Sequence, residues 1–149
     1  DSGAGVVLMH MRGTPLTMNG LAHYDDVVGE VCDALRAAVA AARAAGIAAD
    51  AITVDPGFGF AKEPPHNAAL LRGLARVAGI APVVVGLSRK RCIGAWTGRA
   101  APGDRTAGSV AAALLAVQRG AAVVRVHDVR GTVDALRVLA AVELEAPGG

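Results

Sequence analysis

Residues 51–60 read Ala-Ile-Thr-Val-Asp-Pro-Gly-Phe-Gly-Phe, and this stretch decides how the rest of the sequence is interpreted. Its first half is a short apolar run typical of a buried β-strand. Pro56 and Gly57 end strand pairing and turn the chain, so Asp55 stands at the carboxyl end of the strand. α/β proteins keep their ligand sites at that end. Asp55 is therefore either part of a site or a solvated turn aspartate, which is a common feature.

Outward from this stretch, short apolar runs alternate with segments of helical length. The predicted strands cover residues 6–9, 51–55, 83–88 and 122–127, and the predicted helices cover residues 27–45, 68–78, 107–119 and 132–144. Cap residues mark the helix starts and ends: Asp25 or Asp26, Asn67 and Thr132, then Gly46, Gly79 and Gly120. Residues 89–105 are predicted to form a long polar loop, and residues 146–149 a loose tail. Four βα units in this order predict a parallel sheet with right-handed crossovers.

The composition limits the class of protein. With 149 residues, 53% of them hydrophobic, the chain has the size of one domain or of part of a larger one. A net charge of +2 is too small to indicate nucleic-acid binding. The basic segment 89–105 also has only Trp96 as an aromatic residue on which bases could stack. Cys32 and Cys92, without a CxxC pair, are typical of buried thiols in a reducing compartment such as the cytoplasm. No membrane helix is expected, and a start at Asp1 rather than Met suggests a fragment.

Residue parity predicts which face of each strand a side chain occupies, because side chains alternate along a strand. One parity is apolar in every strand and should face the helices. The other parity carries polar residues toward the carboxyl ends: Asp55, Ser88, Lys90, Arg125 and His127. We expect these side chains to converge on one site. Because an open sheet covered on both faces needs apolar residues at both parities, the pattern favours the inner wall of a barrel.

The predicted site suits a flat, nitrogen-rich ring joined to phosphate groups. Asp55 can accept two parallel N–H donors, and an arginine such as Arg125 can stack on a ring or bind an anion together with His127. The basic segment 89–105 adds cations where barrels often bind phosphate. Two other interpretations remain open: Arg125 and His127 could form a structural pair with Asp128, and the basic segment could be a solvated loop. No spacing of His, Asp and Glu predicts a transition-metal site.

The remaining histidines, His10, His23 and His66, are interpreted as loop or capping residues rather than ligands. Met9 lies at the carboxyl end of the first predicted strand. A methionine there is more often part of a core than a ligand contact.

Four segments together resemble the dihydropteroate synthase family. They are residues 9–15 (Met-His-Met-Arg-Gly-Thr-Pro), residues 55–62 (Asp-Pro-Gly-Phe-Gly-Phe-Ala-Lys), residues 86–90 (Gly-Leu-Ser-Arg-Lys) with Ile93 and Gly94, and residues 125–129 (Arg-Val-His-Asp-Val). Their order and spacing match the family over essentially the whole chain, although Ala61 stands where the family often has glycine. The resemblance implies that residues 1–149 form a partial pterin-binding domain. It would be the C-terminal half, strands 5–8, of a (β/α)₈ TIM barrel whose N-terminal half is absent.

This resemblance implies a transferase of folate biosynthesis. The family condenses 6-hydroxymethyl-7,8-dihydropterin pyrophosphate with p-aminobenzoate, which gives 7,8-dihydropteroate and pyrophosphate. The implied catalytic residues are Lys90, Arg125 and His127. Asp55 would bind the ring N–H and amino groups of the pterin, Lys90 its carbonyl side, and Arg125 would stack on the ring and hold pyrophosphate beside His127.

The resemblance also implies residues that line the substrates. Met9 and Gly86 would line the pterin slot, and Phe60 and Ser88 would lie near p-aminobenzoate, which sulfonamide drugs mimic. Mg²⁺ would assist the departure of pyrophosphate, with its ligand in the missing half. The full-length protein would be a homodimer, and the fragment would be inactive alone.

Two alternative functions stay open from the sequence. One is another pterin-binding barrel of the methyltetrahydrofolate methyltransferase type, which lacks the Ser-Arg-Lys and Arg-Val-His signatures. The other is a non-catalytic half-barrel that binds a pterin or phosphate.

Overall fold

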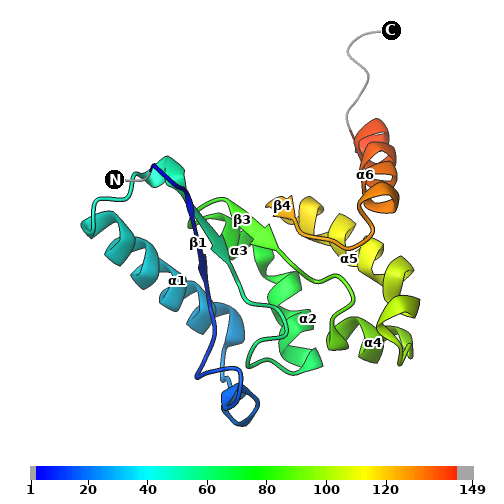
Figure 1. Cartoon of the computed structure of the whole chain (residues 1–149), viewed down its shortest axis with the longest axis horizontal. Helices are drawn as coiled ribbons and strands as arrows, with labels where there is room; N and C mark the ends of the chain where they lie inside the picture. Colours follow the sequence, from blue (N-terminus) through cyan, green and yellow to red (C-terminus); the bar gives the residue numbers. More distant parts are fainter. Residues whose placement is uncertain (1–2, 144–149) are drawn as a thin grey trace, which may run out of the picture.

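Four short apolar runs form one parallel sheet in the computed structural model, which describes residues 3–143 (Figure 1). The strands are β1 (Val6–Met9), β2 (Ile52–Asp55), β3 (Val83–Val85) and β4 (Ala121–Val124). Each strand pairs with the next one in the sequence, in the order β1-β2-β3-β4. The prediction of an α/β fold with parallel strands is confirmed, and the carboxyl ends of the strands lie at one edge.

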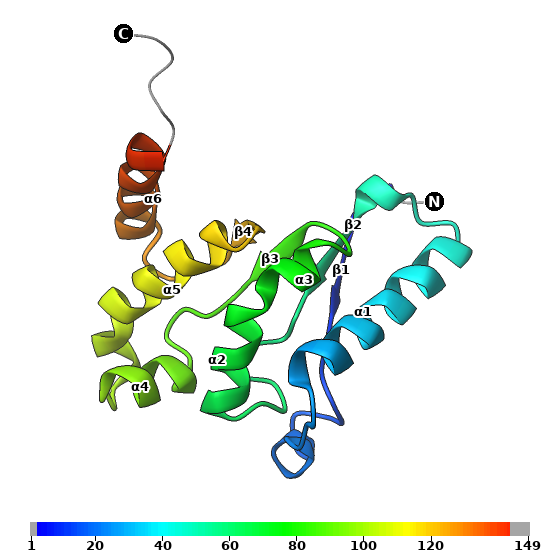
Figure 2. The same cartoon turned by 180° about the vertical axis from the view of Figure 1, so that it is seen from behind.

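Helices cover one face of this sheet and leave the other face open (Figures 1 and 2). The helices are α1 (Val27–Ala44), α2 (Pro64–Arg72), α3 (Leu74–Ala78), α4 (Arg91–Thr97), α5 (Thr106–Gln118) and α6 (Val129–Glu143). Of these, α6 packs against α5 and stands apart from the sheet (Figure 1). Ile52 and Val54 of β2 are buried on the helix-covered face. On the other face, Met9 is 42% exposed and Val123 is 50% exposed. The predicted assignment of faces by parity is therefore confirmed.

The helix ends confirm some predicted caps and correct others. The Asp26 carboxylate accepts a hydrogen bond from Val28 N at 3.1 Å and caps α1 as predicted. The predicted cap Thr132 lies within α6 instead, where its hydroxyl donates to Asp128 O. The Asp128 carboxylate accepts from Gly131 N at 3.0 Å, so Asp128 holds the start of that helix. The predicted tail at 146–149 lies outside the described residues.

The predicted cap at Asn67 is wrong. The second helix begins at Pro64, because proline fits the first helical position and Glu63 N donates to His66 Nδ1 at 3.2 Å. This bond confirms His66 as a capping residue. Asn67 is buried one turn inside α2, and the helix breaks at Gly73 before α3 begins.

Residues 89–105 do not form one long loop, which corrects the sequence prediction. They contain α4 and a 3-10 helix, Pro102–Arg105. α4 forms because Cys92 and Ile93 pack into the core beneath the sheet's edge, and Gly98 ends it in the left-handed conformation, with φ of 71°. The third and fourth strands are also shorter than predicted, so residues 86–88 and 125–127 lie just beyond them.

Two edges of the sheet are open among residues 3–143, since β1 and β4 each have a single strand neighbour. Exposed valines also lie along α6, including Val138 at 65% exposure. Among these same residues, no helix has both the length and the apolar character that crossing a membrane requires.

Candidate functional site

Asp55 stands at the carboxyl end of β2 with half of its carboxylate already engaged. Gly57 N donates to Asp55 Oδ1 at 2.7 Å, which leaves the second oxygen available. The neighbouring strand places Met9 in register with Asp55 on the open face of the sheet. The backbone of Asp55 is fixed as well, because His10 N donates to its carbonyl oxygen at 3.0 Å. A fixed, half-buried carboxylate of this kind can accept N–H donors from a ligand.

Lys90 reaches toward Asp55 from the segment between β3 and α4. Its Nζ donates to Phe58 O and lies 4.5 Å from the centroid of the Phe60 ring. Burial lowers the pKa of Lys90, the charge of Asp55 opposes that shift, and Arg125 adds to it. The charges of Asp55 and Arg125 therefore both reach Lys90, which lies between them at the carboxyl ends of the strands.

Arg125 and His127 follow β4 on the same side of the chain. Arg125 N donates to Val85 O at 2.8 Å, and its guanidinium crosses Gly86 so closely that a Cβ there would lie 3.0 Å from it. His127 is held by buried Ser88, whose Oγ lies 3.2 Å from His127 N and 2.9 Å from His127 Nδ1. Within residues 3–143 no ion pair joins Arg125 or His127 to Asp128, so the structural-pair interpretation is wrong.

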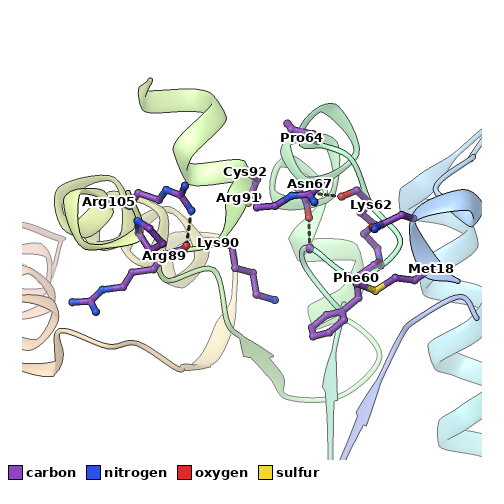
Figure 3. A pocket seen from close by; sticks show the side chains of 13 residues that line it. Met18, Phe60, Lys62, Pro64, Asn67, Arg89, Lys90, Arg91, Cys92 and Arg105 are labelled. Carbon is purple, nitrogen blue, oxygen red and sulfur yellow. Dashed lines mark hydrogen bonds between the residues drawn. The ribbon is translucent and has the colours of Figure 1, made fainter. Parts of the chain in front are cut away.

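A pocket of about 410 Å³ lies between the loop after β2 and the start of α4 (Figure 3). Phe60 and Lys90 line it together with further cations and two amides: Lys62, Arg89, Arg91, Arg105, Asn19 and Asn67. The predicted site thus has two parts that meet at Lys90. Met9, Asp55, Gly86 and Arg125 lie along the open sheet face, Phe60 lies in the loop pocket, and Ser88 with His127 borders the sheet face beyond Arg125.

Sequence reasoning missed the buried network beneath this site. Lys62 is 6% exposed, and its Nζ donates to Gly57 O at 3.1 Å and to Phe60 O at 3.0 Å. His10 is also buried, and its Nδ1 lies 2.9 Å from that same Nζ. Burial lowers the pKa of Lys62 to about 7 and the pKa of His10 to about 4. The signal in the sequence was a lysine closing the Phe-Gly-Phe-Ala-Lys segment, one of only two lysines in the chain.

Asn67 completes the support of the loop after β2. Its Oδ1 accepts from Gly59 N at 2.8 Å, and its Nδ2 donates to Lys62 O and Glu63 O. Ala61 in the same loop has φ of 49°, a left-handed conformation that favours glycine. The loop is therefore held in a demanding shape by side chains on both sides.

Stability is expected to fall between pH 6.5 and pH 4 because of His10. Its folded pKa of about 4 lies below the ordinary 6.5, owing to burial and to the charges of Lys62 and Arg12, with Glu30 opposing. The unfolded chain therefore binds more protons in this interval, and up to about 3 kcal/mol of stability is lost as the pH falls. Urea unfolding at several pH values checks this: His10→Asn should flatten the slope, and exposed His23→Asn should not. Equal slopes in the two variants would contradict the assignment.

The described residues do not fit a magnesium site. Across residues 3–143, no three side chains of His, Cys, Asp or Glu come together in a way that could hold a metal ion. The charge of the carboxylate at the site, Asp55, raises the pKa of Lys62 and of Lys90, against the larger effect of their burial.

A carboxylate, a lysine and an arginine gather at the carboxyl ends of parallel strands, an arrangement whose chemistry suits a flat, nitrogen-rich ligand. Residues 1–127 match the family described as pterin binding enzyme, and the chain belongs to that family. Dihydropteroate synthase of Neisseria meningitidis serogroup B is 51% identical over 138 residues, covering 90% of this chain and 48% of that relative. Dihydropteroate synthase of Escherichia coli strain K12 is 44% identical over 142 residues, which cover 95% of this chain and 50% of that relative.

The fold comparison points the same way. A structure of Xanthomonas albilineans dihydropteroate synthase with 4-aminobenzoic acid has a TM-score of 0.90 and 51% sequence identity, covering 97% of this chain and 51% of that one. The chain spans about half the length of the relatives and structures it matches.

Proposed function

We propose that this chain supplies half of the active site of a dihydropteroate synthase. It would be the C-terminal half, strands 5–8, of a (β/α)₈ barrel, with residues 1–149 as a partial pterin-binding domain. Support comes from the sequential parallel sheet, its open inner face, and the half-length match to synthases from other organisms. The open edges β1 and β4 would pair with the remaining strands of the barrel.

The observation that carries the proposal is the position of Lys90. It stands where the sheet face with Asp55 meets the pocket with Phe60. A cation at this junction can contact both substrates while the bond between them forms. We therefore assign the pterin to the sheet face and p-aminobenzoate to the loop pocket.

Each charged residue then has a role in the condensation. Asp55 accepts the N–H groups of the pterin, and Arg125 stacks on the ring across Gly86, with Met9 along the slot. The bond between the pterin methylene carbon and the pyrophosphate oxygen breaks, and its electron pair leaves with pyrophosphate. Arg125 and His127 stabilise the resulting negative charge.

The second half of the reaction forms the new bond. The amine nitrogen of p-aminobenzoate attacks the methylene carbon, forms the C–N bond and releases a proton. Ser88 lies close to this substrate in the family pattern, but it is buried and its Oγ contacts His127. Ser88 therefore orients the imidazole and does not act as a nucleophile.

The test measures dihydropteroate formation from pterin pyrophosphate and p-aminobenzoate. The full-length protein that contains this chain is expected to form the product, and the purified 149-residue chain is expected to form none. Calorimetry with pterin pyrophosphate should likewise detect binding only by the full-length protein. An inactive full-length protein would overturn the proposed function. Product formation by the homogeneous 149-residue chain would overturn the division of the site between two halves.

No metal-binding group of His, Cys, Asp and Glu side chains lies among the described residues, so the proposed magnesium ion needs ligands from other residues. We propose that the magnesium ligands lie elsewhere in the full-length protein, where a bound ion would help to neutralise the charge of the departing pyrophosphate. Sulfonamide binding, homodimer formation and a cytoplasmic location stay predictions from the family resemblance.

A further inference from the structure

The loop after β2 is tied together by a closed set of hydrogen bonds that the proposed chemistry does not use. Lys62 Nζ binds the carbonyl oxygens of Gly57 and Phe60, which stand at the two ends of the turn 57–60. A turn fixed at both carbonyls has little freedom to change shape. The Phe60 side chain, which lines the pocket, therefore depends on Lys62 for its position.

His10 links this turn to the neighbouring strand. Its ring nitrogen Nδ1 lies 2.9 Å from Lys62 Nζ, and its backbone N donates to Asp55 O at 3.0 Å. The Asp55 carboxylate in turn accepts from Gly57 N. The bonds thus run from Asp55 through Gly57, Lys62 and His10 back to Asp55.

The protons of Lys62 are fully accounted for in this arrangement. In its protonated form Lys62 has three N–H donors, and Nζ has three partners: two carbonyl oxygens and an imidazole nitrogen. The third bond needs a neutral imidazole whose Nδ1 carries no proton, and the lowered pKa of His10 keeps the ring neutral at pH 7. Because both side chains are buried, removing either partner leaves the other unsatisfied.

We propose that Lys62 and His10 are positioning residues that hold Asp55 and Phe60 in the geometry required by the two substrates. The inference rests on the proposed function for the identity of those substrates. Both side chains are buried, and the hydrogen bonds of Lys62 Nζ go to the turn and to the His10 ring. Their effect is transmitted through the backbone of the turn, so they contribute to affinity without contacting the pterin. A displacement of about 1 Å in such a loop can lower catalytic efficiency about 100-fold.

The first test follows the loop itself in the full-length protein that contains this chain. Hydrogen–deuterium exchange of peptides covering residues 55–62 should be faster in Lys62→Met than in the unaltered protein. Peptides from α1 should exchange as before. Arg43→Met, an exposed cation on α1, is the matched control and should leave both regions unchanged. Unaltered exchange at 55–62 in Lys62→Met would overturn the proposal whether or not the protein binds a pterin.

The second test separates positioning from simple stability. His10→Asn keeps an acceptor near the position of Nδ1, whereas His10→Leu removes it. The asparagine variant should retain slow exchange at 55–62 and a dissociation constant for pterin pyrophosphate within about twofold of the unaltered protein. The leucine and Lys62→Met variants should both weaken that binding by about tenfold.

The outcomes distinguish the two proposals. If the unaltered full-length protein does not bind pterin pyrophosphate, the proposed function fails, and the exchange measurements alone decide on the network. If it binds and His10→Leu binds equally well, positioning by His10 is overturned. Equal losses in His10→Asn and His10→Leu would likewise overturn it, since an acceptor would then make no difference.

Discussion

Gly57→Ala is expected to destabilise the protein by at least about 3 kcal/mol and to abolish pterin binding. Gly57 has φ of 70°, a conformation that costs a residue with a Cβ roughly 1–2 kcal/mol. The new Cβ would also overlap the carbonyl oxygen of His10, which is backbone and cannot rotate away. Separating the two segments would break the bonds from Gly57 to Asp55 and Lys62, at about 1 kcal/mol each.

Gly98→Ala is the control for this substitution. Gly98 has φ of 71°, almost the same as Gly57, but a Cβ there would meet no atom within 4 Å. Gly98→Ala should therefore show only the conformational cost of roughly 1–2 kcal/mol. Urea unfolding of both variants, compared with the unaltered protein, measures the difference. If the two alanines cost the same, the close approach between Gly57 and His10 has no energetic consequence.

Asp55→Asn is expected to weaken pterin binding by about 100-fold while leaving the fold intact. The amide oxygen of asparagine can still accept from Gly57 N, so the turn keeps its hydrogen bond. The other position then carries an NH₂ group in place of an oxygen. It faces the N–H donors of the pterin, and two opposed donors in a desolvated site cost about 1–3 kcal/mol.

Calorimetry with pterin pyrophosphate in the full-length protein measures this effect. Asp50→Asn is a suitable control, because Asp50 is exposed and precedes β2 at the opposite end of the strand. It should bind the pterin normally, and both variants should unfold at nearly the same urea concentration as the unaltered protein. Normal affinity in Asp55→Asn would remove Asp55 from the pterin-binding role.

The alternation of apolar and polar residues along each strand predicted the two faces of the sheet. It could do so because apolar side chains must be buried on one face of every strand, whatever the neighbouring strand is. Ile52 and Val54 had to face helices, and so Asp55 had to face away from them. The position of the site followed from the same argument. Its charged residues converge because parallel strands end at one edge, which needs no knowledge of long-range contacts.

Helix α4 could not be predicted in the same way. It has seven residues with a glycine inside, its N-cap position is Lys90, and its side chain makes no capping hydrogen bond. Its stability comes from burying Cys92 and Ile93 in the core. The prediction at Asn67 was wrong although asparagine is a favoured N-cap residue. The helix begins earlier, at Pro64, because proline fits the first helical position, and the Asn67 side chain is buried inside the helix.

The role of Lys62 depends on a partner 52 residues away in the sequence, His10. No local pattern encodes that pairing, because lysine is normally a surface residue and its stem fits a loop equally well when exposed. Only the fold shows that the segment turns its last residue inward. The same holds for the pocket, whose walls come from segments separated by β3.

The order of the strands has a consequence for how this protein is made. Each strand pairs with the strand next to it in the sequence, so every pairing closes the chain over one connection that contains one or two α-helices. On the ribosome, β2 emerges after α1 and can then dock onto β1, and β3 and β4 can follow in turn. The sheet can therefore grow unit by unit during translation. A pause in synthesis between units would leave the last completed strand as the template for the next.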